Sequence, residues 1–421
     1  MANKKGKNQY DNGKKPPDHL LAKALHEYAR KGFTLEERLD RLGKDFDYFV
    51  KIRTLKKLNQ KFQVPTVKKP PPTPISTTIV CKYINANLTS GNGPATIQRR
   101  IAQLEGVLIP CDTVRTIMLL NDPDGFNIRN PTRKVKPRRK GHLVGYGVFQ
   151  EIHCDGHEKL NHKALQLGGV GIDIYGMKCH GSGQIIEEFV VPNARCEYTV
   201  AHCYLDMVEA YGEIPEQLTV DGGTETGQMR ACHIALRNIY APELSFETHP
   251  PFVALKSSDN VPIESSWENL RKYNGRDLKE AILMTKDADK RYFNPLNPVH
   301  INLFNWVWPK VTHVSVQEFK EYWNNHCVRN QPNKILPSGV RPTAVFDFPE
   351  HYGLKHCGIK VDKEVVRHLR NQLEKSREEC FSWVSDEFNL KAQEAYEKLG
   401  SPKFEIVSGW TLFCEMLPLV Q

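Results

Sequence analysis

Three carboxylates occupy positions where an α/β protein often places its chemistry. Asp155 comes just past a predicted strand, and Asp221 lies at the carboxyl end of another. The residue that follows a buried strand faces the crevice beyond the sheet. Glu264 lies in the first turn of a predicted helix that begins after Asn260, at the edge of its apolar face. Oxygen ligands of this kind can hold two Mg²⁺ ions about 4 Å apart, which stabilise both the attacking and the leaving oxygen of a phosphoryl displacement.

Spacing alone leaves alternatives open. The chain contains 49 Asp and Glu residues, so the three carboxylates could be ordinary capping and surface groups. Glu268 competes with Glu264 for the third position, because it lies one turn further along the same helix. We expect two neighbouring residues, His153 and Asp173, to be structural and to hold strand ends through hydrogen bonds.

The elements that must position these carboxylates form an α/β pattern. Alternating and β-branched stretches predict strands around 148–153, 164–177 and 185–191, with two strands in the second stretch. A helical stripe over 199–211 and a short buried strand over 218–220 follow. Strands in antiparallel order, followed by alternation of strand and helix, indicate a sheet domain of the α/β or α+β class.

A helical unit over residues 16–63 precedes this core. Two short helices are followed by a third, which carries Arg53, Lys56 and Lys57 on its polar face. Such a pattern is typical of a helix-turn-helix, whose basic third helix would enter the major groove of DNA. The alternative is an ordinary three-helix bundle with a charged surface.

The rest of the N-terminal region divides into four segments. Residues 1–15 predict a disordered basic tail, and five prolines within 64–75 predict a semi-rigid linker. Residues 76–125 predict a second helix-turn-helix-like unit of lower charge, for which a docking role is the alternative. A basic linker covers 126–144. The linker's candidate contacts to DNA phosphates are Arg133, Lys134, Arg138, Arg139 and Lys140.

The net charge of +9 is unevenly distributed. Residues 1–70 hold 18 Lys and Arg against 8 Asp and Glu, and residues 126–141 hold seven basic side chains and no acidic one. Residues 142–421 therefore carry a net charge of −8. A basic N-terminal region followed by an acidic remainder indicates a protein that binds a polyanion through its basic part. The alternative is that these charges are ordinary solvated surface groups. The basic run 133–140 also resembles a nuclear-import patch.

Composition excludes several classes of protein. Hydrophobic residues make up 40% of the chain and charged residues 25%, the balance of a globular protein without a membrane partner. No apolar run approaches the roughly 20 residues of a membrane span, and the polar N-terminus has no signal-peptide pattern. Eleven cysteines without a Cys-x-x-Cys pair argue against disulfides and against a structural zinc site. We therefore expect a protein that is not secreted, and that is nuclear or cytoplasmic before import.

The residues around the three carboxylates resemble the signatures of DDE-type integrase core domains, the proteins related to retroviral and Gypsy-type integrases and transposases that occur in fungal and animal genomes. Two motifs resemble the second and third signatures: Val-Asp-Gly-Gly-Thr-Glu around Asp221 and Ile-Glu-Ser-Ser-Trp around Glu264. Together the matching stretches cover roughly 145–350, in the order 153–160, 171–173, 220–225, 260–267, 323–326 and 341–346.

The resemblance implies an RNase H-like mixed-sheet catalytic core over 145–350, with Asp155, Asp221 and Glu264 as both the catalytic residues and the ligands of two Mg²⁺ or Mn²⁺ ions. It implies a DNA strand transferase of transposable-element origin that cuts and joins DNA, with element ends and target DNA as partners and a homo-oligomer as the active form. Two alternatives stay open, a catalytically silent DNA-binding protein and a metal-dependent nuclease of the same fold.

Two further groups of residues complete these expectations. Lys159, Arg271 and Lys272 are candidates for contacts with DNA phosphates near the carboxylates, or else solvated surface charges. Residues 351–421 contain an amphipathic helical pattern but no motif, and they form a C-terminal helical extension of unknown role.

Overall fold

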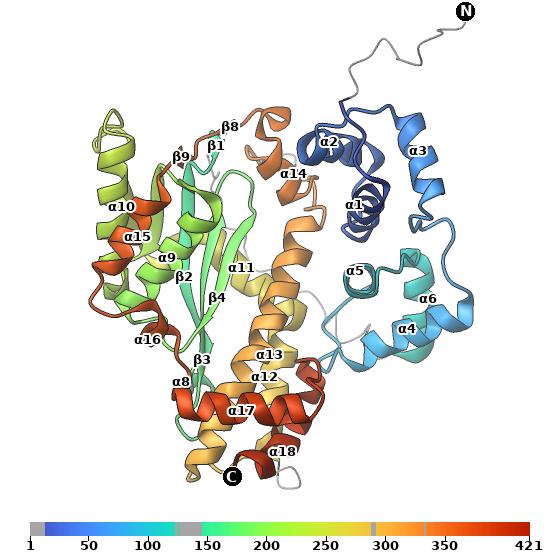
Figure 1. Cartoon of the computed structure of the whole chain (residues 1–421). Helices are drawn as coiled ribbons and strands as arrows, with labels where there is room; N and C mark the ends of the chain where they lie inside the picture. The colour runs from blue at the N-terminus through green and yellow to red at the C-terminus, as the bar shows by residue number, and fades with distance from the viewer. Residues whose placement is uncertain (1–12, 123–124, 126–144, 288–291, 332–333) are drawn as a thin grey trace, which may run out of the picture. The chain divides into compact units, whose positions relative to one another are not determined.

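The computed structural model of the chain describes residues 13–122, 125, 145–287, 292–331 and 334–421. It divides into two compact units, Met1–Arg133 and Lys134–Gln421. In its described part the first unit is helical, and the second holds a five-stranded sheet with helices on both faces (Figure 1). This confirms the predicted α/β class with an all-helical region before the sheet. The basic linker over 126–144 lies outside the described residues.

Three helices form the first half of the N-terminal unit, α1 (Asp18–Arg30), α2 (Leu35–Phe46) and α3 (Ile52–Lys61). Their apolar faces meet in a small core that contains Leu21, Leu42 and Leu55. A capping box starts α2, because Thr34 N–H donates to Glu37 Oε2 at 2.6 Å and Glu37 N–H donates to Thr34 Oγ1 at 3.2 Å. This reciprocal pair satisfies two amides that the helix cannot.

Three further helices form the second half, α4 (Thr73–Asn85), α5 (Pro94–Glu105) and α6 (Cys111–Asn121). Helix α4 begins inside the stretch expected to be a linker, because proline is tolerated in the first turn, where its missing N–H has no helical partner. Hydrogen bonds join the halves of this unit. Arg30 Nη1 donates to Gln103 O at 2.9 Å, and Arg99 Nη2 donates to Lys31 O at 2.5 Å.

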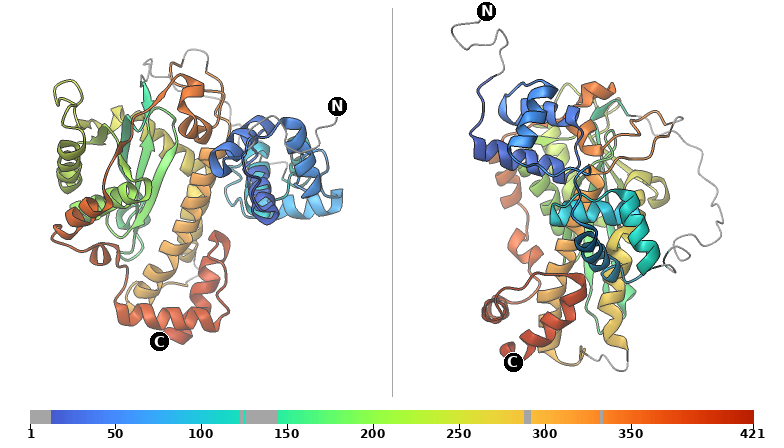
Figure 2. Two further views of the ribbon diagram at one scale, coloured as in Figure 1. Left: turned by 45° about the horizontal axis from the view of Figure 1, so that its top comes forward. Right: turned by 90° about the vertical axis from the view of Figure 1, so that its right-hand side faces the viewer.

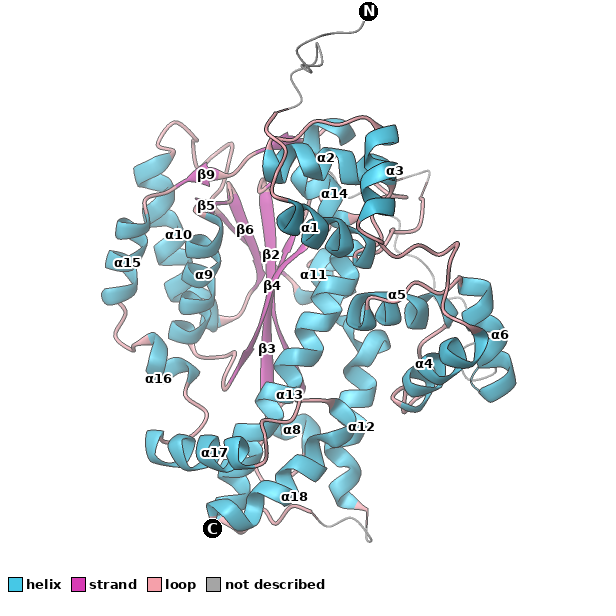
Figure 3. Ribbon diagram, turned by 45° about the vertical axis from the view of Figure 1, so that its right-hand side comes forward, coloured by secondary structure: helices cyan, strands magenta, loops and turns pink. Residues whose placement is uncertain are grey.

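The sheet of the second unit has the strand order β4-β3-β2-β6-β7. Strands β2, β3 and β4 are antiparallel neighbours, whereas β2, β6 and β7 run parallel to one another (Figure 3). Their bounds are β2 (Glu151–Leu160), β3 (Ile172–Cys179), β4 (Ile185–Val191), β6 (Gln217–Asp221) and β7 (Phe252–Leu255). Strand β2 is therefore central and joins the antiparallel part of the sheet to the parallel part.

Two expectations about the strands are wrong. The strand expected around 148–153 continues to Leu160 as β2, so Asp155 lies inside the strand and not just past it. The stretch 164–177 was predicted to hold two strands, but it contributes only to β3. Its first residues belong to the short helix α8 (His162–Leu165), which the Asn161 side chain caps by accepting from Ala164 N–H at 2.9 Å. Gly168 and Gly169 then adopt positive φ angles of 60° and 87°, which an extended strand does not allow.

Helices cover both faces of the sheet, and Figure 2 shows the same layers from two further directions. Helices α9 (Glu197–Tyr211), α10 (Gly227–Tyr240) and α15 (Lys363–Asn371) pack with β2 and β6 around a core that includes Ile152 and Leu218. The opposite face meets α11 (Val261–Leu270) and α13 (Pro298–Asn325), with α12 (Arg276–Leu283) beside them. Trp306 and Trp308 of α13 are fully buried in that second core.

Residues 351–421 lie within the same compact unit as the sheet. Val366 of α15 joins the core under α9, whereas Trp410 and Phe413 of α18 (Gly409–Val420) join the core on the other face. Ion pairs from Arg370 and Arg377 to Asp206, at 2.9 and 2.8 Å, fix this segment to α9. The remaining elements are α14 (Pro342–Asp347), α16 (Arg377–Phe381), α17 (Asp386–Lys398) and the short strands β1 (Gly147–Val148), β5 (Glu213–Ile214), β8 (Lys355–His356) and β9 (Ile359–Lys360).

Among the helices of the described residues, none combines the length and the apolar character needed to cross a membrane.

Candidate functional site

Polar side chains line one face of the central strand. They occupy alternate positions of β2, and successive side chains of a strand point to opposite faces, so these residues share a face: Glu151, His153, Asp155 and His157. The alternate residue Ile152 is fully buried in the core under α9. The polar face therefore looks toward α11, whose residues contact it as described below.

Asp155 and Asp221 lie at matching positions on adjacent parallel strands. The pairing of β2 with β6 ends at His153 and Thr219, and the two aspartates come two residues further along their strands. A step of two residues returns each side chain to the same face. The topology therefore brings both predicted aspartates to one edge of the sheet.

A glycine makes room for the aromatic ring that holds Asp155. Gly176 of β3 pairs with Asp155, and a Cβ atom built on Gly176 would lie 2.4 Å from Cη2 of Trp267. Without that Cβ the Trp267 ring lies over the sheet, and its Nε1–H donates to Asp155 Oδ2 at 2.8 Å. The other carboxylate oxygen, Oδ1, accepts from Gly156 N–H at 2.9 Å. Trp267 also stacks on His157, with ring centroids 4.8 Å apart.

Glu264 belongs to the first turn of α11, as predicted, and Ser257 Oγ donates to its Oε1 at 2.6 Å. The pKa of Asp155 is raised to about 7, chiefly by burial; the negative charges of Asp221 and Glu264 add to this shift, while hydrogen bonds from Trp267 and Gly156 oppose it. The three predicted carboxylates are thus near enough to act on one another electrostatically.

Glu268 is engaged elsewhere. Its carboxylate pairs with Arg271 at 2.7 Å and with Lys272 at 3.1 Å, and the hydrogen bond from Arg271 lowers its pKa to about 2. Among the charges that shift the pKa of Asp155, Glu264 is present and Glu268 is not. The arrangement favours Glu264 as the third member of the set. It also shows that Arg271 and Lys272, both exposed, already have a carboxylate partner.

The basic residues predicted to contact DNA are spread over the chain. Arg53, Lys56 and Lys57 are exposed on α3, on the side away from the buried Leu55. Lys159 is exposed near the end of β2. The other candidates lie outside the described residues: Arg133, Lys134, Arg138, Arg139 and Lys140.

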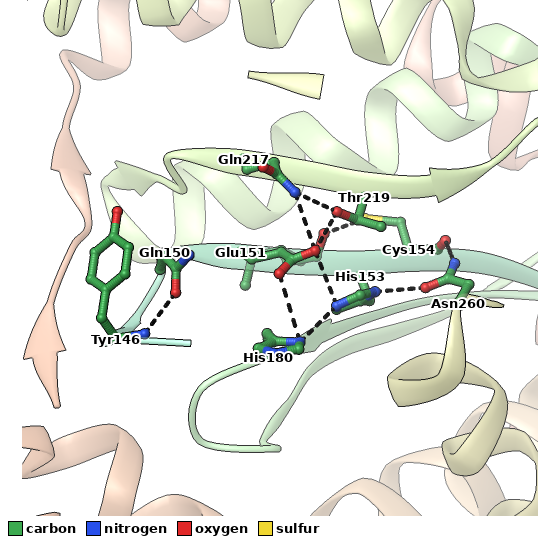
Figure 4. Close-up of polar contacts among 10 residues, drawn as sticks. Tyr146, Gln150, Glu151, His153, Cys154, His180, Gln217, Thr219 and Asn260 are labelled. Atoms are coloured by element: carbon green, nitrogen blue, oxygen red, sulfur yellow. Dashed lines mark hydrogen bonds and ion pairs between the residues drawn. The ribbon is translucent and has the colours of Figure 1, made fainter. Parts of the chain in front are cut away.

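A second polar group lies on the same face of β2 and was not predicted. Glu151 Oε1 is 3.3 Å from His153 Nε2, which is 2.9 Å from His180 Nδ1, and His180 Nδ1 is 3.7 Å from Glu151 Oε2 (Figure 4). Within the described residues, this is the one group of three or more His, Cys, Asp and Glu side chains whose ligand atoms all lie within 4.8 Å of one another. Asp155, Asp221 and Glu264 are not gathered as tightly.

Asn260 connects this second group to α11. It is the N-cap residue of α11, as predicted, yet its side chain makes no capping hydrogen bond. Instead, Asn260 Nδ2 donates to Cys154 O at 3.1 Å, and its Oδ1 lies 2.6 Å from His153 Nδ1. Burial lowers the pKa of His153 to about 4, so the imidazole is neutral at pH 7. His153 thus holds a strand end through hydrogen bonds, as expected. It also belongs to the group of Glu151, His153 and His180, whose side chains could bind a metal ion.

Sequence reasoning missed His180 because its partners come from elsewhere in the chain. The spacing of Glu151 and His153 on one strand was a usable signal, since such residues share a face. His180 follows β3, and only the antiparallel register, in which Ile152 pairs with Cys179, brings it opposite Glu151. The backbone confirms this position, because His180 N–H donates to Glu151 O at 2.9 Å.

No protein-family model matches the chain, and no curated protein matches it either. Inference about function therefore depends on the arrangement of the residues described above. That arrangement offers two separate kinds of chemistry on one strand face: three carboxylates near the edge of the sheet, and a mixed carboxylate and imidazole group further back along β2.

Proposed function

We propose that this protein is a DDE-type polynucleotidyl transferase, which cuts and joins DNA by in-line phosphoryl transfer. The observation that carries the proposal is the placement of Asp155 and Asp221 at matching positions on parallel strands, with Glu264 in the first turn of α11, the helix whose Trp267 contacts Asp155. We also propose that the fold of the sheet unit is RNase H-like. A sheet of three antiparallel strands continued by two parallel ones, with the carboxylates at the junction, supports it.

The donor set suits hard divalent cations. Asp155, Asp221 and Glu264 offer only oxygen atoms, and the charges of Asp221 and Glu264 add to the burial that raises the pKa of Asp155. These three residues would hold two Mg²⁺ or Mn²⁺ ions. The ions would stabilise the charge that develops on the attacking and leaving oxygens of a phosphodiester.

The chain's own residues orient these ligands. Trp267 holds one oxygen of Asp155, so the carboxylate plane is fixed before any ligand arrives. Ser257 holds Glu264 in the same way. Because the pKa of Asp155 is about 7, this carboxyl group holds a proton for part of the time at neutral pH and releases it when a positive charge approaches.

The partners follow from the same proposal. The exposed basic side chains of α3 would contact DNA phosphates, and such contacts position a protein without reading sequence. Strand transfer between two DNA ends implies a homo-oligomer, and DNA as the substrate implies a nuclear protein.

Two observations favour a second candidate, a catalytically silent DNA-binding protein with the same fold. Both oxygens of Asp155 already accept hydrogen bonds from the protein, and the three carboxylates are not drawn within 4.8 Å of one another. Such a protein would keep the three carboxylates in place but would not cut DNA.

A nicking assay separates the candidates. Supercoiled plasmid is incubated with the full chain and Mg²⁺ or Mn²⁺, beside Asp155→Asn, Asp221→Asn and Glu264→Gln. We expect metal-dependent nicking or joining that each substitution lowers by at least about 100-fold, since removing a ligand removes stabilisation from the transition state. Glu268→Gln, one helical turn away, is the matched control and should keep the activity. Activity that survives Glu264→Gln but not Glu268→Gln would make our third ligand wrong, and plasmid binding without any nicking would favour the silent protein.

A further inference from the structure

We propose that Glu151, His153 and His180 form a binding site for one transition-metal ion, with Zn²⁺ as the ion that fits the ligand set. This site is distinct from the three carboxylates at the edge of the sheet, and it does not depend on the proposed DNA chemistry. Two imidazole nitrogens and one carboxylate are ligands that Zn²⁺ accepts and Mg²⁺ does not favour.

The distances fit a single ion. Ligand atoms about 2.0–2.1 Å from a tetrahedral Zn²⁺ lie about 3.3 Å from one another. His153 Nε2 and His180 Nδ1 are 2.9 Å apart; His153 Nε2 is 3.3 Å from Glu151 Oε1, and His180 Nδ1 is 3.7 Å from the other carboxylate oxygen, Oε2. With one ligand atom from each residue, the three atoms all lie within 4.8 Å of one another, so the side chains can close on a single ion. Three protein ligands leave a fourth position for water.

The surroundings orient the ligands before the ion binds. The carbonyl of Cys154 can only accept, so Asn260 must direct its Nδ2 toward it and its Oδ1 toward His153. Asn260 Oδ1 then accepts from His153 Nδ1–H, which leaves the lone pair of His153 on Nε2, the atom that faces His180 and Glu151. A second partner that fixes the tautomer is a regular feature of metal-binding histidines.

Glu151 is supported in the same manner. Thr219 Oγ1 donates to its Oε1 at 2.5 Å, and Gln217 Nε2 donates to the same oxygen at 3.2 Å (Figure 4). Both donors come from β6, so the carboxylate is held between neighbouring strands. The side chains of His153 and His180 are only 4% and 5% exposed, and that of Glu151 is 15% exposed. A site this enclosed points to a structural ion that joins β2 to the turn after β3.

The competing arrangement has no ion. A hydrogen bond from His180 Nδ1–H to His153 Nε2 would then satisfy the two rings, and Glu151 would be held by Thr219 and Gln217 alone. The two arrangements differ in one measurable property, the binding of a stoichiometric metal ion.

The test uses the full chain, stripped of metal with a chelator and titrated with Co²⁺, whose ligand-field absorption reports its coordination. The titration is run in a 100-fold excess of Mg²⁺, which competes for the three carboxylates, and under these conditions we expect one Co²⁺ per chain, displaced by Zn²⁺. His180→Ala and Glu151→Gln should each weaken binding by at least 100-fold. His351→Ala, an exposed histidine outside the group, is the control and should bind as the wild type does.

Other results overturn the proposal. Failure of the wild type to bind Co²⁺ or Zn²⁺ with one-to-one stoichiometry would do so, as would unchanged binding by both variants, which would place the ion elsewhere. Glu151→Gln keeps an oxygen that can accept from Thr219, so it guards against a folding defect in His180→Ala; circular dichroism of each chelated variant checks that the fold is retained. Asp155→Asn should bind Co²⁺ normally, and this separates failure of the metal site from failure of the proposed DNA chemistry.

Discussion

Trp267 Nε1 donates a hydrogen bond to Asp155 Oδ2 at 2.8 Å, so an aromatic residue of α11 sets the orientation of a carboxylate on β2. The two residues are 112 positions apart in the sequence. Their contact depends on Gly176, because any side chain there would occupy the space of the Trp267 ring. The helix that carries Glu264 is thereby aligned with the strand that carries Asp155.

Replacement of Trp267 by Phe should shift the pH dependence of nicking. The ring still fills the space over Gly176, but the donor to Asp155 is lost. That hydrogen bond lowers the pKa of Asp155, so its removal should raise this pKa by about one unit, the worth of a hydrogen bond to a charged group. The midpoint of the activity profile should move to higher pH by a similar amount. Trp323→Phe is the matched control, since Trp323 donates to the Gly183 carbonyl, and an equal shift there would contradict the assignment.

Replacement of Asp155 by Asn should stabilise the protein at alkaline pH when no divalent ion is present. The folded-state pKa of about 7 lies above the unfolded value near 3.8, so the folded protein binds the extra proton and wild-type stability falls as pH rises from about 4 to about 7. Above pH 7 the variant should unfold with a free energy higher by about 2–4 kcal/mol, and the difference should vanish near pH 4. Urea unfolding at a series of pH values measures this, and an advantage independent of pH would refute the explanation.

A methyl group at Gly176 should be costly. Its Cβ would lie 2.4 Å from Cη2 of Trp267, and core overpacking of this kind costs about 1–3 kcal/mol. Gly176→Ala should therefore lower the free energy of unfolding by that amount and reduce nicking as well, because Trp267 is displaced from Asp155. Gly222→Ala is the control for stability, since a Cβ at Gly222 would meet no atom within 4 Å. Equal stability of the two variants in thermal unfolding would count against the packing argument.

Two lysines on α3 should contribute to DNA binding through charge alone. The double substitution Lys56→Ala and Lys57→Ala should weaken binding to duplexes of unrelated sequence by similar factors. The slope of log K against log salt should become shallower by about 2, because each lost phosphate contact removes close to one released counterion. The double substitution Lys391→Ala and Lys398→Ala on α17 removes the same charge from exposed positions and serves as the control. Identical salt slopes for both double variants would mean that α3 makes no specific contact.

Local signals in the sequence predicted much of the fold. The strand expected over 185–191 is β4, and the helix expected over 199–211 agrees with α9 within two residues. The capping box at Thr34 and Glu37 follows a spacing that is visible in the sequence. These elements were predictable because their hydrophobic spacing and end residues act within a few positions. Strand β7 was not predicted, since its residues are only half-buried and show no clean alternation.

The site was predictable only in part, for a related reason. Asp221 and Glu264 could be singled out from a strand end and a helix start, whereas Asp155, expected just past a strand, lies within β2. The structure brings Asp155 and Asp221 to matching positions on neighbouring strands. The group around His180 could not be singled out, because it depends on the register of β2 against β3. Gly176 also had no visible role until Trp267 was placed above it. Contacts between distant segments carry this information, and local patterns do not contain it.

The division of the last 71 residues between the two faces of the sheet has a consequence for synthesis. Helix α15 completes one core and α18 completes the other. A growing chain on the ribosome therefore exposes apolar surface of both cores until these two helices have emerged. The sheet unit cannot close progressively from its N-terminus, and its nascent form offers chaperones two faces to protect at once.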